Sequence, residues 1–359
     1  MQSKVMKTVC VLLAVLLSVA ALTSCDLSFS KQEETPEPVA VTLKTDLHDA
    51  MFTFTYGELK EVLPADMLAN LFEDFQEKTD DTEIQLNYND IKARYSGNKN
   101  DPELFNKVLA LLDDSEQAAL AANRAEVLEY YTRIANAVKT QKPQTEYKED
   151  FWVSDSTIKF TDANGAEADE NSALAKSARL YKDFIMDGLK GALPNGATEA
   201  EENLNDIVYL KGSDLVSSIT LADIDAIYSS VTATTEKNSA EQDVVTELTR
   251  TVEIHLKNDE AAIRKAYSFR DPADVLSKLN RPENSFTITK ADVTPFDCVI
   301  TATFNAATDE LLSLSYDKNM KVTATLTGEG SLESLGTQTV NFDCGGNMYY
   351  RFGWASEAK

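Results

Sequence analysis

Histidines and nucleophiles are the residues with which a search for chemistry begins, and this chain has few histidines. His48 and His255 are the only two in 359 residues. A serine or cysteine nucleophile needs a histidine held beside it, but His48 has no partner identifiable from sequence, and His255 falls on the polar phase of a predicted strand. The patterns G-x-S-x-G, H-E-x-x-H and C-x-x-C do not occur. The sequence therefore predicts no catalytic residue, no metal site and no cofactor.

Carboxylates are abundant, with 59 Asp and Glu against 34 Lys and Arg and a formal net charge of −25. Nucleic acid is not an expected partner, because phosphate binding needs clustered basic side chains. A pair of carboxylates could hydrolyse a glycosidic bond, but their separation is spatial and the sequence selects no pair. The acidic turn at residues 162–170 lacks the spacing of a calcium-binding loop. Asp113-Asp114 is expected at a loop or a solvated helix end.

The N-terminus has the pattern of a targeting segment. Lys4 and Lys7 precede an apolar run at residues 9–22, which as a helix is about 21 Å long, short of the ~30 Å hydrocarbon core of a bilayer. A secretory signal peptide over residues 1–24 is therefore predicted. Residues 25–40 are rich in Ser, Glu and Pro and are expected to form a tether.

The end of this segment, Leu22-Thr23-Ser24-Cys25, resembles the lipobox of bacterial lipoproteins. The resemblance implies cleavage before Cys25, a thioether-linked diacylglycerol on its sulfur and an acyl chain, such as palmitate, on the new N-terminus. The protein would then be anchored in the cell membrane by lipid and face outside the cytoplasm. An ordinary signal peptide that contains Cys25 is the alternative. Asp26 resembles an inner-membrane retention signal of enterobacterial lipoproteins, but it would mean nothing in a Gram-positive envelope, so the envelope type stays open.

Two cysteines would remain in the body once Cys10 is removed and Cys25 is lipidated. Cys298 and Cys344 both lie in the inward phase of predicted strands. An exported protein can keep a disulfide, and closing a loop of about 46 residues contributes on the order of 4 kcal/mol. We predict a Cys298–Cys344 disulfide, with two buried free thiols as the alternative.

The elements that must position these residues differ between the two halves of the chain. Helical spacing predicts helices at 58–78 (broken at Pro64), at 101–112, from Ser115 to Pro143 and at 171–189. Alternation of apolar and polar residues predicts strands at 151–161, 252–256, 298–304, 312–326, 340–344 and 348–354, and a helix is expected at 259–280. Lys318 alone interrupts the alternation of 312–326, so Asp317-Lys318-Asn319 is predicted to form a hairpin turn. The expected fold is α+β, with a mainly helical region over 41–200. A curved antiparallel sheet over 201–359, packed on one face by helix, would form the β-rich α+β domain.

Three phrases carry a family resemblance. Residues 129–143 (EYYTRIANAVKTQKP) are similar to a helix-ending phrase of uncharacterised Firmicutes surface lipoproteins, and 296–304 (FDCVITATF) with 309–316 (DELLSLSY) resemble their C-terminal strand pair. The strand pair also resembles LolA-like half-barrels, which implies a curved sheet that wraps a helix. The resemblance supplies no catalytic residue.

Three functions remain open at this point. The first is non-catalytic binding of an envelope protein or a small hydrophobic ligand by a lipid-anchored envelope protein, and the second is a structural or assembly role in the envelope. The third is a carboxylate-dependent hydrolase of wall polysaccharide. A sheet face filled by the chain's own Phe, Tyr and Leu side chains would count against carriage of a hydrophobic ligand.

Overall fold

The structure is a computed structural model that describes residues 37–354, apart from residues 46, 48–50, 70–77, 88–90, 92–93, 96–100, 102, 163, 168, 170, 191–192, 268–279 and 281–285. All the elements described below belong to one compact unit, Val39–Lys359.

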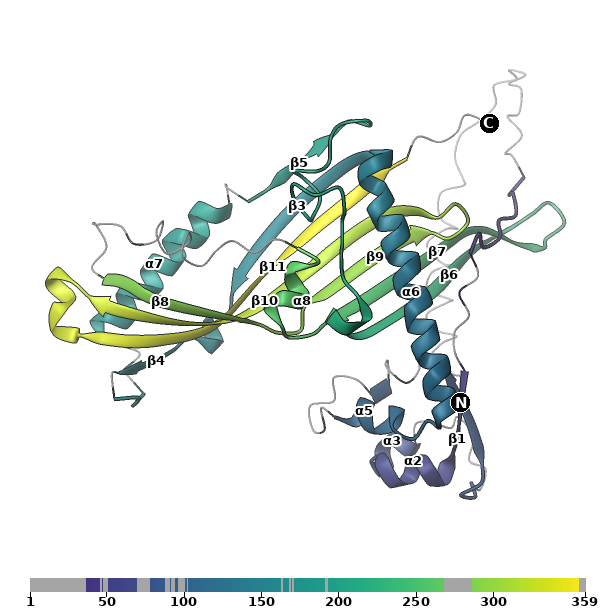
Figure 1. Cartoon of the computed structure of the whole chain (residues 1–359), viewed down its shortest axis with the longest axis horizontal. Coiled ribbons are helices and arrows are strands. Elements are labelled where there is room, and N and C mark those ends of the chain that lie inside the picture. The colour runs from purple at the N-terminus through teal and green to yellow at the C-terminus, as the bar shows by residue number, and fades with distance from the viewer. Residues whose placement is uncertain are drawn as a thin grey trace, which may run out of the picture. The chain divides into compact units, whose positions relative to one another are not determined.

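The main feature of the described residues is a nine-stranded antiparallel sheet (Figure 1). Seven strands follow the order β5-β3-β11-β10-β9-β7-β6, while β4 pairs with β11 and β8 with β10. The backbone N–H and C=O groups of each strand bond to those of its neighbours. These bonds join strands that are far apart in sequence into one continuous sheet. The strands are β3 (Gln144–Val153), β4 (Lys159–Asp162), β5 (Asn195–Thr198), β6 (Ile224–Lys237), β7 (Asp243–Leu256), β8 (Phe286–Pro295), β9 (Val299–Asn305), β10 (Glu310–Gly328) and β11 (Thr337–Gly353).

Strands β10 and β11 run the whole length of the sheet, whereas their neighbours are interrupted. At one end, β10 pairs with β9 and β11 with β3; at the other end, β10 pairs with β8 and β11 with β4. The short helix η1 (Asp155–Thr157) separates β3 from β4. The sheet thus has a seven-stranded part and a four-stranded part that share two continuous strands.

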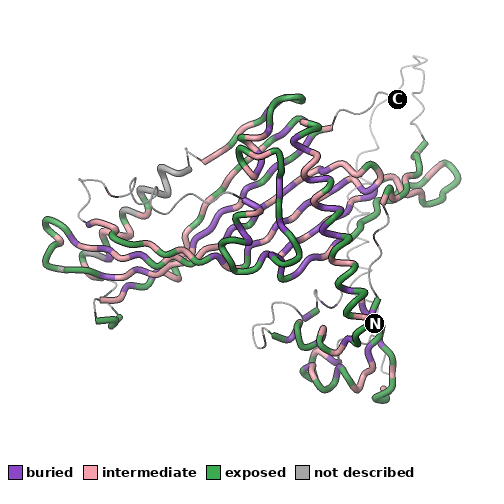
Figure 2. The backbone as a smooth tube through the Cα atoms, viewed as in Figure 1, coloured by how far each residue is buried: buried purple, intermediate pink, exposed green. Residues whose placement is uncertain are grey.

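Each part of the sheet buries one face. In the seven-stranded part, the inner side chains of β7, β9, β10 and β11 pack against α6 (Asp114–Gln141), α8 (Glu260–Arg264) and an irregular segment at residues 204–219. In the four-stranded part, Phe160, Phe286 and Leu326 form a second core with Ala175 of α7 (Ala173–Lys190). Figure 2 shows the resulting alternation of buried and exposed positions along the strands.

Helix α6 serves two cores. Its N-cap is Asp113, whose carboxylate accepts hydrogen bonds from the backbone N–H groups of Ser115 and Glu116, so the acidic pair Asp113-Asp114 lies at a helix start as expected. Leu120, in the first half of the helix, belongs to a small core, and residues from Val127 onward belong to the core of the sheet. The small core is formed by β1 (Met51–Thr55), α2 (Tyr56–Val62), α3 (Ala65–Ala69), β2 (Glu83–Asn87) and α5 (Leu104–Leu109), and β1 pairs with β2 alone.

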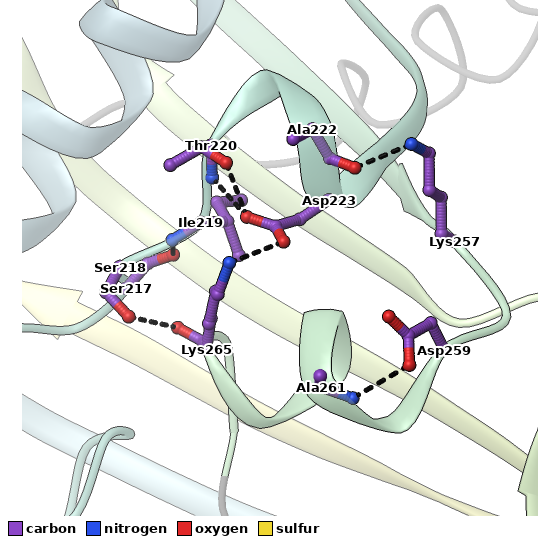
Figure 3. Close-up of polar contacts among 10 residues, drawn as sticks. All are labelled: Ser217, Ser218, Ile219, Thr220, Ala222, Asp223, Lys257, Asp259, Ala261 and Lys265. Atoms are coloured by element: carbon purple, nitrogen blue, oxygen red, sulfur yellow. Dashed lines mark hydrogen bonds and ion pairs between the residues drawn. The ribbon is translucent and has the colours of Figure 1, made fainter.

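A group of polar contacts fixes the irregular segment against the sheet (Figure 3). Asp223, at the end of η2 (Leu221–Asp223), accepts hydrogen bonds from the Lys265 ammonium (2.6 Å) and the Thr220 backbone N–H (2.8 Å). Burial opposes ionisation of Asp223, but the bonds from Lys265 and Thr220 prevail and lower the pKa of this carboxyl. Lys257 donates to the Ala222 carbonyl at 2.6 Å. The contacts join the start of β6, the end of β7 and α8.

The prediction of a mainly helical N-terminal region is wrong. Residues 41–200 contain β1 to β5, and β3, β4 and β5 pair into the same sheet as the C-terminal strands. The long helices predicted from Ser115 and at 171–189 are confirmed as α6 and α7, while α2, α3, α5 and α8 have only five to seven residues each. The described chain is thus mostly β rather than a helical region followed by a sheet domain. The antiparallel sheet itself is confirmed.

The predicted hairpin turn at Asp317-Lys318-Asn319 is also wrong. Strand β10 continues without a turn from Glu310 to Gly328, and Lys318 pairs with Gly346 in the middle of it. The side chain of Lys318 is buried in the inner phase of the strand. A lysine in the apolar phase of a strand favours a break, but here the Lys318 ammonium pairs with the Glu149 carboxylate of β3 and the strand continues.

Candidate functional site

An exposed strip of aromatic and polar side chains runs along the outer face of β3, β11 and β10, opposite the filled core. We call it the outer strip and define it as Lys148, Asp150, Trp152, Ser315, Asp317, Asn347 and Tyr349. Its two aromatic members are the least expected, because Trp152 is 39% and Tyr349 42% exposed. Large aromatic side chains contribute most free energy when they are buried. Their exposure on a regular sheet therefore marks this strip as a candidate binding surface.

Trp152 is held in place by a glycine on the neighbouring strand. Trp152 of β3 pairs with Gly345 of β11. A Cβ atom on Gly345 would come within 2.7 Å of the indole ring and within 2.4 Å of the Lys318 carbonyl oxygen. The indole therefore lies close against the backbone at Gly345. Gly345 allows this close approach, which no other residue could.

Tyr349 lies farther along β11, where it pairs with Lys148. Tyr349 is four positions along β11 from Gly345, the partner of Trp152. The backbone positions of the two aromatic residues are therefore about 13 Å apart along the strands and one strand apart across them. Tyr349 also lines a cavity of about 330 Å³ together with Glu146, Lys148 and residues 195–197 of β5. The outer strip thus extends from the indole of Trp152 to a cavity beside β5, the edge strand of the sheet.

Hydrogen-bonding groups lie between and beside the two aromatic residues. Lys148 forms an ion pair with Asp150 at 2.7 Å, and both side chains are more than half exposed. Asn347 donates through Nδ2 to the Asp317 carboxylate (2.5 Å) and to the Ser315 hydroxyl (2.9 Å). One lysine and two aspartates give the strip a formal charge of 1 − 2 = −1, compared with −25 for the whole chain. The outer strip thus carries one net negative charge, that of Asp317, beside the Lys148–Asp150 ion pair.

A second cavity, of about 280 Å³, lies beside α6 and the β9–β10 turn. Its central group is Asp309, which accepts hydrogen bonds from the hydroxyls of Tyr130 (3.1 Å) and Thr45 (3.0 Å) and forms an ion pair with Arg133 at 3.4 Å. Burial, and then the Asp309 carboxylate, raise the pKa of Tyr130. These groups join the N-terminal segment, α6 and the turn, so their polar atoms are engaged in holding three elements together. The cavity is lined by Lys44, Arg133, Ile134, Ala137, Gln141, Thr308, Asp309, Glu310 and Trp354.

The inner face beneath the outer strip is filled by tyrosines. The rings of Tyr209, Tyr267 and Tyr350 surround that of Tyr316 at centroid distances of 5.3, 5.5 and 6.3 Å, in edge-to-face arrangements. Burial raises the pKa of Tyr267, Tyr316 and Tyr350, so their hydroxyls stay protonated. The Tyr350 hydroxyl donates to the Ile207 carbonyl at 3.0 Å. This tyrosine cluster is a packed core rather than a pocket.

Lys318 enters the same cluster as a buried charge. Its ammonium lies 2.5 Å from the Glu149 carboxylate of β3 and donates to the Tyr209 hydroxyl at 3.1 Å. Burial alone would lower the pKa of Lys318, but Tyr209 and Glu149 raise it above its ordinary value. The lysine is thus charged and paired, which is the arrangement that stabilises a buried ion.

The cysteines named by the sequence are placed as follows. Cys25 lies outside the described residues, so its lipidation stays a prediction. Cys298 and Cys344 are buried free thiols in the structure, and burial raises the pKa of both, that of Cys344 to about 12. The Cys298 thiol lies 3.5 Å from the Asn319 carbonyl oxygen. The disulfide stays a prediction, and non-reducing mass mapping of protein from its native host tests it.

The histidines do not come together with a nucleophile in the described part of the chain. His48 lies outside that part. His255 lies on the outer phase of β7, stacks on Tyr228 and shares a 2.5 Å hydrogen bond with Glu253. The sequence correctly placed His255 on the polar phase of its strand.

Sequence reasoning missed both aromatic members of the outer strip. Tyr349 occupies the polar phase of the strand predicted at 348–354, between the inward Met348 and Tyr350. An aromatic residue in a polar phase is the signal that could have identified it. Trp152 gives a weaker signal, because its strand alternates poorly.

The described residues contain no cluster of three or more His, Cys, Asp or Glu side chains that could hold a metal ion. Within the same ranges, no helix is both long enough and apolar enough to cross a bilayer.

No family model, curated protein or solved structure matches the chain. The resemblance to Firmicutes surface lipoproteins and LolA-like half-barrels therefore stays a prediction.

Proposed function

We propose that this chain is a lipid-anchored protein of the cell envelope that binds an envelope component without catalysis, through the outer strip. The lipid on Cys25 would hold it at the outer side of the cell membrane, and residues 25–40 would let the folded body reach away from the bilayer. The observation that carries the proposal is the pair of exposed rings, Trp152 and Tyr349, fixed on a rigid sheet.

Rigidity favours binding at this place. Trp152 rests on Gly345 and Tyr349 stands on a central strand, so little side-chain or backbone freedom is lost when a ligand docks. Exposed aromatic rings that are already held in position are typical centres of binding energy.

The packing of the inner face counts against carriage of a hydrophobic ligand. The inner face of the seven-stranded part is filled by the chain's own side chains, and Tyr267, Tyr316 and Tyr350 are fully buried. Close packing leaves no room for an acyl chain among these residues. Binding at the outer face needs no such room.

Location is tested by substitution of the lipidated residue. Cys25→Ala is expected to move the protein from the membrane fraction to the soluble exported fraction, because the acyl chains are lost. Firm membrane association of this variant would contradict the proposed anchor.

Binding is tested by extraction with detergent. Envelopes from cells that make the wild-type protein are washed with a detergent that dissolves the membrane, and the protein in the insoluble pellet is measured. We expect wild-type protein to stay in the pellet and Trp152→Ala/Tyr349→Ala to be released. Leu180→Ala, which removes a side chain 71% exposed on α7, is the matched control and should stay. Equal retention of the double variant and wild type would contradict binding through the outer strip.

A further inference from the structure

We infer that the ligand of the outer strip is an uncharged polysaccharide chain. This inference rests on the proposed function and adds the chemical class of the ligand. It is carried by the alternation of aromatic rings and hydrogen-bonding groups along the strip, together with the negative charge of the strip and of the chain.

The aromatic rings match the apolar faces of sugars. A pyranose ring presents C–H groups on its faces and hydroxyls around its rim. An exposed indole that lies against the sheet backbone offers a flat surface for the C–H face. With the backbone positions of Trp152 and Tyr349 offset by about 13 Å along the strands, an extended oligosaccharide of several sugars is long enough to reach both rings.

The groups between the rings match the hydroxyls on the rim. Asp150, Asp317 and Asn347 occupy the register between the two aromatic residues and supply carboxylate and amide groups. Lys148 and Ser315 pair with Tyr349 on either side and supply an ammonium and a hydroxyl. These side chains already bond to one another at 2.5–2.9 Å, so their positions are set before a ligand arrives. Charged donors and acceptors form the stronger hydrogen bonds.

Charge distinguishes a neutral chain from an acidic one. The outer strip has a formal charge of −1, but it belongs to a protein of charge −25, whose field repels polyanions. An acidic wall polymer or an anionic lipid surface would be held off by this field. A neutral polysaccharide is not affected by it.

The pattern of the strip also differs from that of a protein–protein interface. Such interfaces centre on a contiguous apolar core surrounded by a polar rim. In the outer strip, by contrast, the two aromatic rings stand apart and the polar groups occupy the middle. A linear ligand with repeating apolar faces and polar edges fits that order better than a protein surface does.

Tryptophan fluorescence offers a direct test, because the chain has only two tryptophans, Trp152 and Trp354. The full chain, purified in detergent, carries Trp354→Phe so that Trp152 alone reports. It is titrated with chitohexaose, a neutral β-1,4-linked oligosaccharide, and separately with the acidic polysaccharide alginate. We expect a saturable change with chitohexaose that shifts less than twofold between low and high salt, and none with alginate.

Two variants show whether the rings cause the binding. Tyr349→Ala should weaken chitohexaose binding at least tenfold, whereas Tyr349→Phe, which keeps the ring, should stay within threefold of the parent. Circular dichroism of both variants confirms that they are folded. Equal binding by the alanine and phenylalanine variants would overturn the assignment of the ring.

The outcomes separate this inference from the proposed function. If chitohexaose causes no saturable change, while Trp152→Ala/Tyr349→Ala is still released from envelopes, then the neutral-polysaccharide class is overturned and binding by the outer strip stands. If the double variant is also retained, both proposals fail. Binding of alginate with strong salt dependence would replace the neutral ligand by an acidic one.

Discussion

Tyr349 and Tyr350 are adjacent in the sequence and have opposite roles in the structure. Tyr350 is fully buried in the tyrosine cluster, where its hydroxyl donates to the Ile207 carbonyl, while Tyr349 is 42% exposed on the outer strip. The period of two along a strand produces this difference. Residue type alone therefore does not tell whether an aromatic residue is buried in the core or exposed at the surface. The face of the strand on which it lies decides this.

The largest expected effect is the loss of stability when the buried ring of Tyr350 is removed. Tyr350→Ala is expected to lower the free energy of unfolding by about 3–5 kcal/mol, because it removes a packed ring and leaves a cavity. Tyr349→Ala should stay within about 0.5 kcal/mol of wild type, as surface substitutions usually do. Urea unfolding of both variants measures the difference. Similar losses for the two would mean that Tyr349 is part of the folded core.

The next largest effect on the free energy of unfolding is expected at the buried Lys318–Glu149 ion pair. Glu149→Ala is expected to cost about 3 kcal/mol of unfolding free energy, because it leaves the Lys318 ammonium buried without its partner. The double variant Lys318→Met/Glu149→Leu removes both charges and should recover to within about 1 kcal/mol of wild type. Urea unfolding again supplies the measurement, and a double variant no more stable than Glu149→Ala would contradict the pairing.

The smallest effect is one of pH, at Lys139 of α6. This buried ammonium donates to the carbonyls of Leu210, Ser213 and Leu215 at 2.7–3.0 Å, and burial lowers its pKa to about 8. Because the unfolded chain keeps this proton up to a pKa of about 10.4, it binds more protons than the folded chain above pH 8. The contribution of Lys139 to stability therefore rises with pH between 8 and about 10.

A matched variant isolates this contribution. Lys139→Met should lower the overall stability, because three carbonyls lose a donor, and should also remove the rise between pH 8 and 9.5. Unfolding free energies of wild type and variant across this range test the expectation. Parallel curves for the two proteins would show that Lys139 has an ordinary pKa.

Local patterns predicted some elements well. The helical stripes gave α6 and α7, and the alternation at 298–304 and 348–354 placed Phe304, Tyr350 and Phe352 on the buried face. In each case apolar residues recur with the period of the element, about 3.6 residues in a helix or two in a strand. The pattern can therefore be recognised from the residues of that element alone.

The rest depended on partners far away in sequence. Lys318 sits inside a strand because Glu149, 169 residues earlier, neutralises it. Strands β3 and β4 alternate weakly on their own, and their place beside β11 is set by pairing across about 200 residues of sequence. Trp152 became an exposed platform because Gly345 makes space for it. No single stretch of sequence contains these relationships.

Retention of Trp152→Ala/Tyr349→Ala in detergent-washed envelopes tests most directly whether the outer strip binds. We expect this double variant to stay folded, with a cooperative urea transition, yet to be released from the insoluble envelope while Leu180→Ala stays bound. A stable double variant that remains in the pellet at the level of wild type would contradict it.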